Sequence, residues 1–268
     1  MQTFDIDPSD LKNVAYLRLE NNPLSSPPLE IVGKGLEAIK SYFEQIKKEG
    51  KDFLFEAKLI IIGESGAGKT TFFGKLKDNN APMPEDKDTT KGITVEPWTF
   101  PLREEDIRAC IEAEELSSEL ITAILQQGFR ANRWDFGGQE IYHSAHQFFL
   151  TRRSLYVLLA DTREQKTDFN YWLSTVEQLG GNSPLLLVLN EKYGHTWRID
   201  ETGLRENFPF FKQIFSFDLS AKNDYRSLES LRKAVCHQIS TLPHLGNPLP
   251  PHARQASSLK VTSKCQWS

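Results

Sequence analysis

The sequence contains little of what marks several large protein classes. Its three cysteines, Cys110, Cys236 and Cys265, are scattered among 268 residues and give neither a disulfide framework nor metal-ligand spacing. No run approaches the roughly 20 apolar residues of a membrane helix, and the N-terminus lacks the basic and apolar segments of a secretory signal. The net charge of −4 comes without a basic stripe, which argues against nucleic acid as the main partner. We therefore expect a cytoplasmic protein with free thiols and no transmembrane segment.

One motif stands out in what is present. Residues 58–70 read Lys-Leu-Ile-Ile-Ile-Gly-Glu-Ser-Gly-Ala-Gly-Lys-Thr, an apolar strand that runs into G-x-x-x-x-G-K-T. The glycines let the backbone N–H groups face inward, where they and the start of the next helix can surround a polyphosphate. Lys69 can reach the β- and γ-phosphates, and Thr70 can ligate Mg²⁺. The expected nucleotide-binding residues of this phosphate loop are consecutive: Gly63, Glu64, Ser65, Gly66, Ala67, Gly68, Lys69, Thr70 and Thr71.

Around this loop, strand patterns alternate with helical patterns. The strands are expected at 57–62, 92–100, 130–135, 154–160, 184–189 and 214–219, with helices at 71–80 and 225–240 among the connections. Two of the strands are continuous apolar runs, typical of strands buried on both faces, and Pro97 marks an edge strand. The order predicts an α/β fold with a mostly parallel six-stranded sheet and helices on both faces. The acidic residues 103–128 interrupt it as an insertion of one or two helices.

The N-terminal segment carries a second, weaker pattern. Val14, Leu17, Leu19, Asn22 and Leu24 fit L-x-x-L-x-L-x-x-N-x-L, which is one leucine-rich repeat, although a chance amphipathic turn is an alternative. A helical pattern follows over 34–48. The expected organisation is therefore a leucine-rich-repeat remnant that caps the fold, with its connecting helix, at 1–50, a nucleotide-binding domain at 53–242 and a linker or frayed tail at 243–268.

The partners that a phosphate loop needs follow in order along the chain. Asp135, at the end of the third strand, can hold Mg²⁺, and Thr90 can close on Mg²⁺ and the γ-phosphate. Gly138 can donate its N–H to the γ-phosphate, and Gln139 can orient the attacking water. At the ends of the last two strands, four residues are expected to hold the base: Asn190, Ser220, Ala221 and Lys222. The catalytic candidates are thus Gln139, Lys69 and Thr90, and the metal ligands are Thr70, Thr90 and Asp135.

This series of motifs resembles a Ras-like G domain, and specifically the Roc domain of the Roco family. Beyond the phosphate loop, the resemblance rests on Asp135-Phe-Gly-Gly-Gln-Glu-Ile-Tyr-His143 and on His146-Gln-Phe-Phe-Leu-Thr-Arg-Arg-Ser-Leu-Tyr156. The repeat followed by Asn22-Pro-Leu-Ser-Ser-Pro-Pro28 is similar to a repeat-to-Roc junction. The segment Leu242-Pro-His-Leu-Gly-Asn-Pro-Leu-Pro250 looks like the start of a COR dimerisation domain.

The resemblance implies a molecular switch in signal transduction that binds GTP–Mg²⁺ and GDP and hydrolyses GTP slowly. It also implies a larger parent protein that forms homodimers through COR, contacts protein partners through leucine-rich repeats and, in many members, carries a kinase domain. This chain contains neither a complete COR domain nor a kinase. Two alternatives remain open: a non-catalytic adaptor that holds nucleotide as a structural ligand, and an ATP-preferring P-loop protein.

The chain departs from the family pattern in its base motif. G domains have N-K-x-D, whereas this chain reads Asn190-Glu191-Lys192-Tyr193. The missing Asp accepts two hydrogen bonds from guanine, so Glu191 or Asp200 would have to substitute for it. In addition, Ser65 replaces a glycine of Ras and crowds the space of an arginine finger. The insertion is expected beside the switch regions, where it could modulate them.

Overall fold

The structure is a computed structural model, and it describes a defined part of the chain. The described residues are 2–3, 11, 14, 17, 24–27, 29–49, 52–83, 93–101, 103–110, 117–136, 153–163, 167–220, 225–242, 244–246 and 248–249. Among them, no helix combines the length and the apolar character needed to cross a membrane. They fold into two compact units, the smaller from the described parts of 1–55, 101–128 and 243–261, and the larger from those of 56–100 and 129–242.

The larger unit is built on a six-stranded sheet with the order β5-β6-β4-β7-β8-β9. Its strands are β4 (Glu56–Ile62), β5 (Ile93–Phe100), β6 (Phe129–Phe136), β7 (Ser154–Asp161), β8 (Leu185–Asn190) and β9 (Phe211–Phe217). Every neighbouring pair is parallel except the edge strand β5, which runs antiparallel to β6. Pro97 lies in β5, where a missing N–H is tolerated because one side of an edge strand has no ladder. The mostly parallel sheet and its edge are therefore confirmed.

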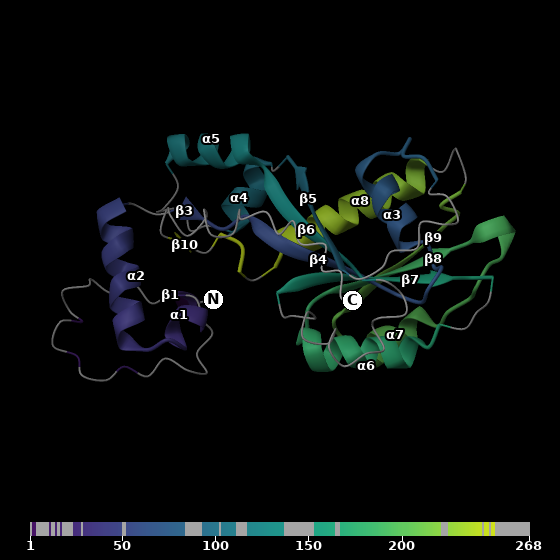
Figure 1. Cartoon of the computed structure of the whole chain (residues 1–268), viewed down its shortest axis with the longest axis horizontal. Coiled ribbons are helices and arrows are strands. Elements are labelled where there is room, and N and C mark those ends of the chain that lie inside the picture. Colours follow the sequence, from purple (N-terminus) through teal and green to yellow (C-terminus); the bar gives the residue numbers. More distant parts are fainter. Residues whose placement is uncertain are drawn as a thin grey trace, which may run out of the picture. The chain divides into compact units, whose positions relative to one another are not determined.

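Helices cover both faces of this sheet, as predicted (Figure 1). The helices α3 (Lys69–Lys77) and α8 (Tyr225–Ser240) lie on one face, and α6 (Phe169–Gly180) and α7 (Glu201–Asn207) lie on the other. The core under α6 is a cluster in which Trp172, Leu173 and Val176 pack against Tyr156 and Leu158 of β7. Because β7 and β8 are buried on both faces, their apolar runs need no alternation.

The largest differences from the expected bounds are at the start of β9 and at the end of α3. Strand β9 begins at Phe211, three residues before the expected start, and residues 218–220 form a turn in which the Asp218 carboxylate accepts from the Ser220 N–H at 2.8 Å. Helix α3 begins at Lys69. It ends at Lys77 because Asp78 takes up an extended conformation and its side chain accepts from the Asn80 N–H. In both places a short polar side chain satisfies the backbone and ends the regular element.

The smaller unit has its own core. The apolar face of α2 (Leu36–Glu49) contributes Ile39, Tyr42 and Phe43, which cluster with Leu11 and with Val32 of α1 (Leu29–Val32). The same unit contains two short ladders: β1 (Gln2–Thr3) pairs parallel with β2 (Leu24–Ser26), and β3 (Asp52–Phe53) pairs antiparallel with β10 (Pro248–Leu249).

The leucine-rich repeat stays a prediction. Of its residues, Val14 and Leu17 pack against the α2 cluster and Leu24 begins β2, whereas Leu19 and Asn22 lie outside the described residues.

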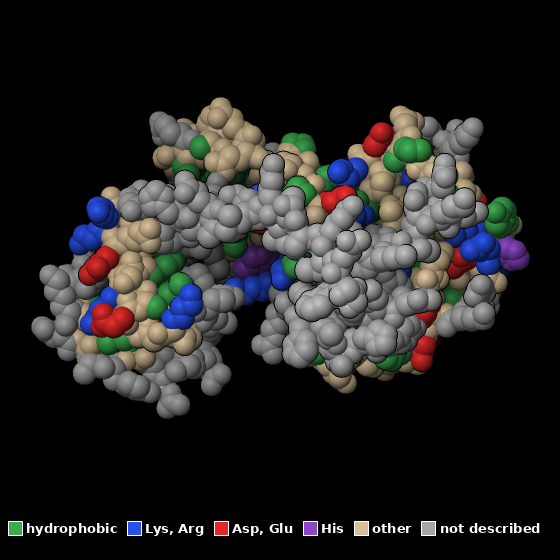
Figure 2. All heavy atoms as spheres, in the orientation of Figure 1, with side chains coloured by type: hydrophobic (Ala, Val, Ile, Leu, Met, Phe, Trp, Pro, Cys, Tyr) green, Lys and Arg blue, Asp and Glu red, His purple; other side chains and the backbone are tan. Residues whose placement is uncertain are grey.

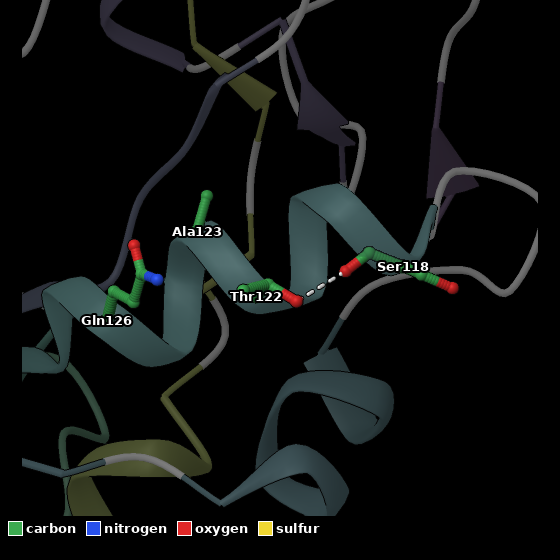
Figure 3. A pocket seen from close by; sticks show the side chains of 4 residues that line it. All are labelled: Ser118, Thr122, Ala123 and Gln126. Carbon is green, nitrogen blue, oxygen red and sulfur yellow. Dashed lines mark hydrogen bonds between the residues drawn. The ribbon is translucent and has the colours of Figure 1, made fainter.

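The described residues of the insertion at 103–128 contain the helices α4 (Glu104–Cys110) and α5 (Ser118–Gln127), and they belong to the smaller unit. Ser117 caps α5 by accepting from the Leu120 N–H at 3.1 Å. Figure 3 shows the outer side of α5, where Ser118, Thr122, Ala123 and Gln126 line a shallow hollow. On the face shown in Figure 2, the described Lys and Arg side chains are scattered and mixed with Asp and Glu, without one large basic area.

Candidate functional site

The phosphate loop curls at the carboxyl end of β4 because its glycines adopt backbone conformations that other residues rarely adopt. Gly63, Gly66 and Gly68 have φ angles of +138°, +77° and +99°. A Cβ on Gly63 would lie 2.2 Å from the Leu159 carbonyl oxygen of β7, and a Cβ on Gly68 would lie 2.9 Å from Asn190 Nδ2. Two of the three positions therefore require glycine for space as well as for conformation.

Lys69 turns its ammonium back into this curl. It is the first residue of α3 and is 7% exposed, and its Nζ donates to the carbonyl oxygens of Gly63 at 2.9 Å and Glu64 at 2.8 Å. The helix N-cap is Gly68, which has no side chain to bond the first N–H groups of α3. A buried cation and uncapped amides at a helix N-terminus form a site suited to an anion.

Asn190 connects the phosphate loop to the turn after β9. Its side chain is fully buried; Nδ2 donates to the Ala67 carbonyl at 2.9 Å, and Oδ1 accepts from the Leu219 N–H at 3.2 Å. Leu219 immediately precedes Ser220, the first residue of the predicted base-holding segment. One side-chain amide thus contacts both the phosphate loop and the residue that precedes the predicted base-holding segment.

A charged group that the sequence reading missed lies beside the loop. Lys192 Nζ is 3.4 Å from the Gly66 carbonyl oxygen and 3.3 Å from Asp161 Oδ2, and Arg163 donates to both Asp161 oxygens. Burial raises the pKa of Asp161, but the hydrogen bonds from Arg163 and the charge of Lys192 outweigh it, so the pKa lies below its ordinary value. The only signal in the sequence is the lysine that stands one place later than in N-K-x-D.

Tyr193, at the acid position of the base motif, and Asp200, a proposed substitute for that acid, lie in different surroundings. Tyr193 is 81% exposed with φ +57° in the short helix η3 (Lys192–Gly194). Asp200 caps α7, where Oδ1 accepts from the Gly203 N–H at 3.0 Å. The Asp200 carboxylate therefore already serves a cap, whereas the Glu191 side chain makes no cap hydrogen bond to η3.

A second contact unforeseen from the sequence joins the phosphate loop to α6. The carboxylate Oε1 of Glu64 accepts from Trp172 Nε1 at 3.2 Å, and the indole is fully buried. No sequence motif links these positions, which are 108 residues apart.

The structure describes only some of the remaining predicted site residues. Ser65 and Thr70 are exposed and Thr71 is half-buried. The backbone of Asp135 pairs with Ile61 of β4, which puts it at the same sheet edge as the phosphate loop, but its side chain lies outside the description. Five predicted residues lie outside the described part of the chain altogether: Thr90, Gly138, Gln139, Ala221 and Lys222. Within the described ranges, no cluster of three or more His, Cys, Asp or Glu side chains could hold a metal ion.

Comparisons with known proteins agree with this geometry. Residues 58–192 match the family described as "Ras of Complex, Roc, domain of DAPkinase". The chain is 28% identical over 250 residues to the probable serine/threonine-protein kinase pats1 of Dictyostelium discoideum, covering 90% of this chain and 8% of the kinase. It is 31% identical over 237 residues to a Roc-COR-CHAT protease of an unknown prokaryotic organism, covering 82% of this chain and 21% of the protease.

A solved structure is also similar. The RocCORdC structure of Methanosarcina barkeri Roco2, bound to GDP, superposes with a TM-score of 0.62 at 27% sequence identity. The match covers 80% of this chain and 58% of that one. The family match extends over half of the chain, beginning within β4, and includes the phosphate loop, strand β7 and Asn190. The chain therefore belongs to the Roc family of Ras-like GTPase domains.

Proposed function

We propose that this chain binds GDP and GTP in the phosphate loop at residues 63–71. The observation that carries the proposal is the position of Lys69, whose ammonium lies inside a glycine curl at the N-terminus of α3. The GDP in the similar Roco2 structure supports a guanine nucleotide as the ligand. Asn190 links the phosphate loop to Leu219, the residue before the Ser220-Ala221-Lys222 segment that is proposed to hold the base.

Binding of the base is expected to be weaker than in a G domain with the complete motif. A hydrogen bond to a charged acceptor contributes roughly 1.5–3 kcal/mol, and Tyr193 does not supply the carboxylate. We expect micromolar GDP binding and a preference over ADP of about one to two powers of ten. Lys192, paired with Asp161, adds a cation beside the phosphate loop.

Mg²⁺ would be held by Thr70, Thr90 and Asp135. The described part of this set fits the ion, because Thr70 is exposed at the end of the phosphate loop and the strand register brings Asp135 to the same edge. Mg²⁺ takes oxygen ligands and keeps several waters, so few protein groups suffice. Bound there, the ion would offset negative charge on the phosphates.

Hydrolysis of GTP is proposed to depend on Gln139, which orients the attacking water, with Lys69 stabilising charge on the phosphates and Thr90 closing over them. The isolated domain is expected to be slow, at about 10⁻⁴ to 10⁻³ per second, for want of an arginine finger. Movement around Thr90 and residues 138–143 would then distinguish the GTP state from the GDP state in signalling.

We propose the wider roles only by analogy with longer proteins of the Roco family. The chain spans only 8% and 21% of the two curated relatives named above, so dimerisation through a COR region, a kinase domain, partners at leucine-rich repeats and a cytoplasmic location all remain proposals.

Calorimetry with GDP, GTP, ADP and ATP in Mg²⁺ tests the binding proposal. Lys69→Ala should abolish detectable binding and leave the circular dichroism spectrum unchanged. Wild-type affinity in this variant would contradict the assignment of the phosphate loop. Preference for ADP over GDP would favour the ATP-binding alternative instead.

Single-turnover hydrolysis separates a switch from a non-catalytic adaptor. Gln139→Leu should slow GTP hydrolysis and leave GTP affinity nearly intact. A wild-type chain that binds GTP and never hydrolyses it would be an adaptor. An unchanged hydrolysis rate in Gln139→Leu would show that another group orients the attacking water.

A further inference from the structure

Glu64 places a carboxylate in a loop built to bind polyphosphate. It directly follows Gly63, and its backbone carbonyl accepts from Lys69 Nζ at 2.8 Å, so the residue is part of the curl that holds the lysine. A negative side chain here would repel bound phosphates, and the repulsion would depend on the direction in which the carboxylate points.

The structure directs this carboxylate toward α6. Its Oε1 accepts from Trp172 Nε1 at 3.2 Å. Helices α6 and α3 lie on opposite faces of the sheet (Figure 1), so the Glu64 carboxylate is bound by a residue of the helix on the face opposite to α3. The backbone N–H groups at the N-terminus of α3 and the Lys69 ammonium are the groups proposed to bind the phosphates.

Trp172 is a rigid donor. Its ring is fully buried in the cluster under α6, and Tyr171 contacts it edge-on with 5.5 Å between ring centroids. The first turn of α6 is itself fixed, because Asp168 caps it by accepting from the Tyr171 N–H at 3.0 Å. The direction of the indole N–H therefore follows from core packing and does not depend on what the phosphate loop binds.

We propose that Trp172 is a positioning residue of the nucleotide site, whose indole N–H holds the Glu64 carboxylate on the α6 side and so keeps its charge away from bound phosphate. The inference rests on the proposed function, since it needs nucleotide in the phosphate loop. It makes α6 an electrostatic determinant of nucleotide affinity without any contact to the ligand.

The test removes the donor and then removes the charge. Trp172→Phe leaves Glu64 charged without its indole donor, and GDP affinity should fall about tenfold. Adding Glu64→Gln removes the charge, and GDP affinity should return to within about threefold of Glu64→Gln alone. Glu64→Gln alone should bind GDP within about threefold of the wild type, because the wild-type carboxylate is already held away from the phosphates. The loss in Trp172→Phe should also shrink between 0.05 and 0.5 M NaCl, because salt screens a charge effect and leaves a packing defect unchanged.

A second variant guards against misfolding. Benzothienylalanine at position 172 replaces the indole N–H by sulfur and keeps the ring size, so it should reproduce the salt-dependent loss with a native circular dichroism spectrum. If Glu64→Gln does not restore GDP affinity in either variant that lacks the indole N–H, the inference is overturned. The proposal that the wild type binds GDP is then unaffected. A wild type that binds no GDP would overturn the proposed function and this inference with it.

Discussion

The side chain of Asn190 donates from Nδ2 to the Ala67 carbonyl oxygen at 2.9 Å, across a separation of 123 residues. The same amide accepts from the Leu219 N–H, so one buried side chain joins the phosphate loop, the end of β8 and the turn after β9. The motif residue therefore has a structural task in addition to the contact with the base that the motif predicts.

Asn190→Asp should destabilise the fold by about 1–3 kcal/mol. The carboxylate still accepts from Leu219, but it cannot donate to Ala67 and instead faces the carbonyl oxygen. Urea unfolding at pH 7 measures the change. The exposed Asn182→Asp is the matched control and should change stability by less than about 0.5 kcal/mol. Equal stability of the two variants would show that the Asn190 bond contributes nothing.

Gly68→Ala should destabilise more than Gly66→Ala. Both positions have positive φ, and the left-handed conformation costs a non-glycine residue roughly 1–2 kcal/mol. A Cβ at Gly66 meets open space, whereas a Cβ at Gly68 would press on Asn190 Nδ2 at 2.9 Å and displace its bond to Ala67. Comparing the thermal unfolding of Gly68→Ala with that of Gly66→Ala isolates the steric contribution to the loss of stability at Gly68. A Gly66→Ala variant as unstable as Gly68→Ala would contradict this account.

Asp161→Asn should weaken the fold at neutral pH and lose its effect in acid. The pKa of Asp161 is lower in the folded chain than its ordinary value, so the stability it contributes is present above the unfolded pKa, near 3.9, and is lost as pH falls through the folded pKa. Urea unfolding at pH 7, 5 and 3 should show the wild type converging on the variant. Glu201→Gln, which removes an exposed ion pair with Arg205, should show little effect at any pH.

Tyr193→Asp should tighten GDP binding by about one to two powers of ten and leave ADP binding unchanged. The substitution restores the motif's acceptor, and Asp tolerates the left-handed backbone that Tyr193 adopts at φ +57°. Competition calorimetry with both nucleotides gives the ratio. If the wild type already rejects ADP by several powers of ten, Glu191→Gln becomes the next variant, because Glu191 would then be the acceptor.

Much of the fold was predictable because its signals are local. The apolar runs of β7 and β8 were placed within a residue of their observed bounds, since strands buried on both faces need continuous apolar sequence. The start of β9 was missed by three residues, because Phe210 and Phe211 belong to the core while the later residues turn through Asp218. The inclusion of α4 and α5 in the smaller unit depends on contacts between distant segments and has no local signal.

The sequence by itself determined the phosphate loop, the parallel sheet and the family, because glycine spacing and apolar periodicity act through neighbouring residues. Tertiary structure alone decided which side chains meet around that loop. Asn190 contacts Ala67, Trp172 contacts Glu64, and Lys192 contacts Gly66, each across more than 100 residues. The physical reason is that such contacts depend on strand register and on how the helices pack over the sheet, which no single segment of the sequence specifies.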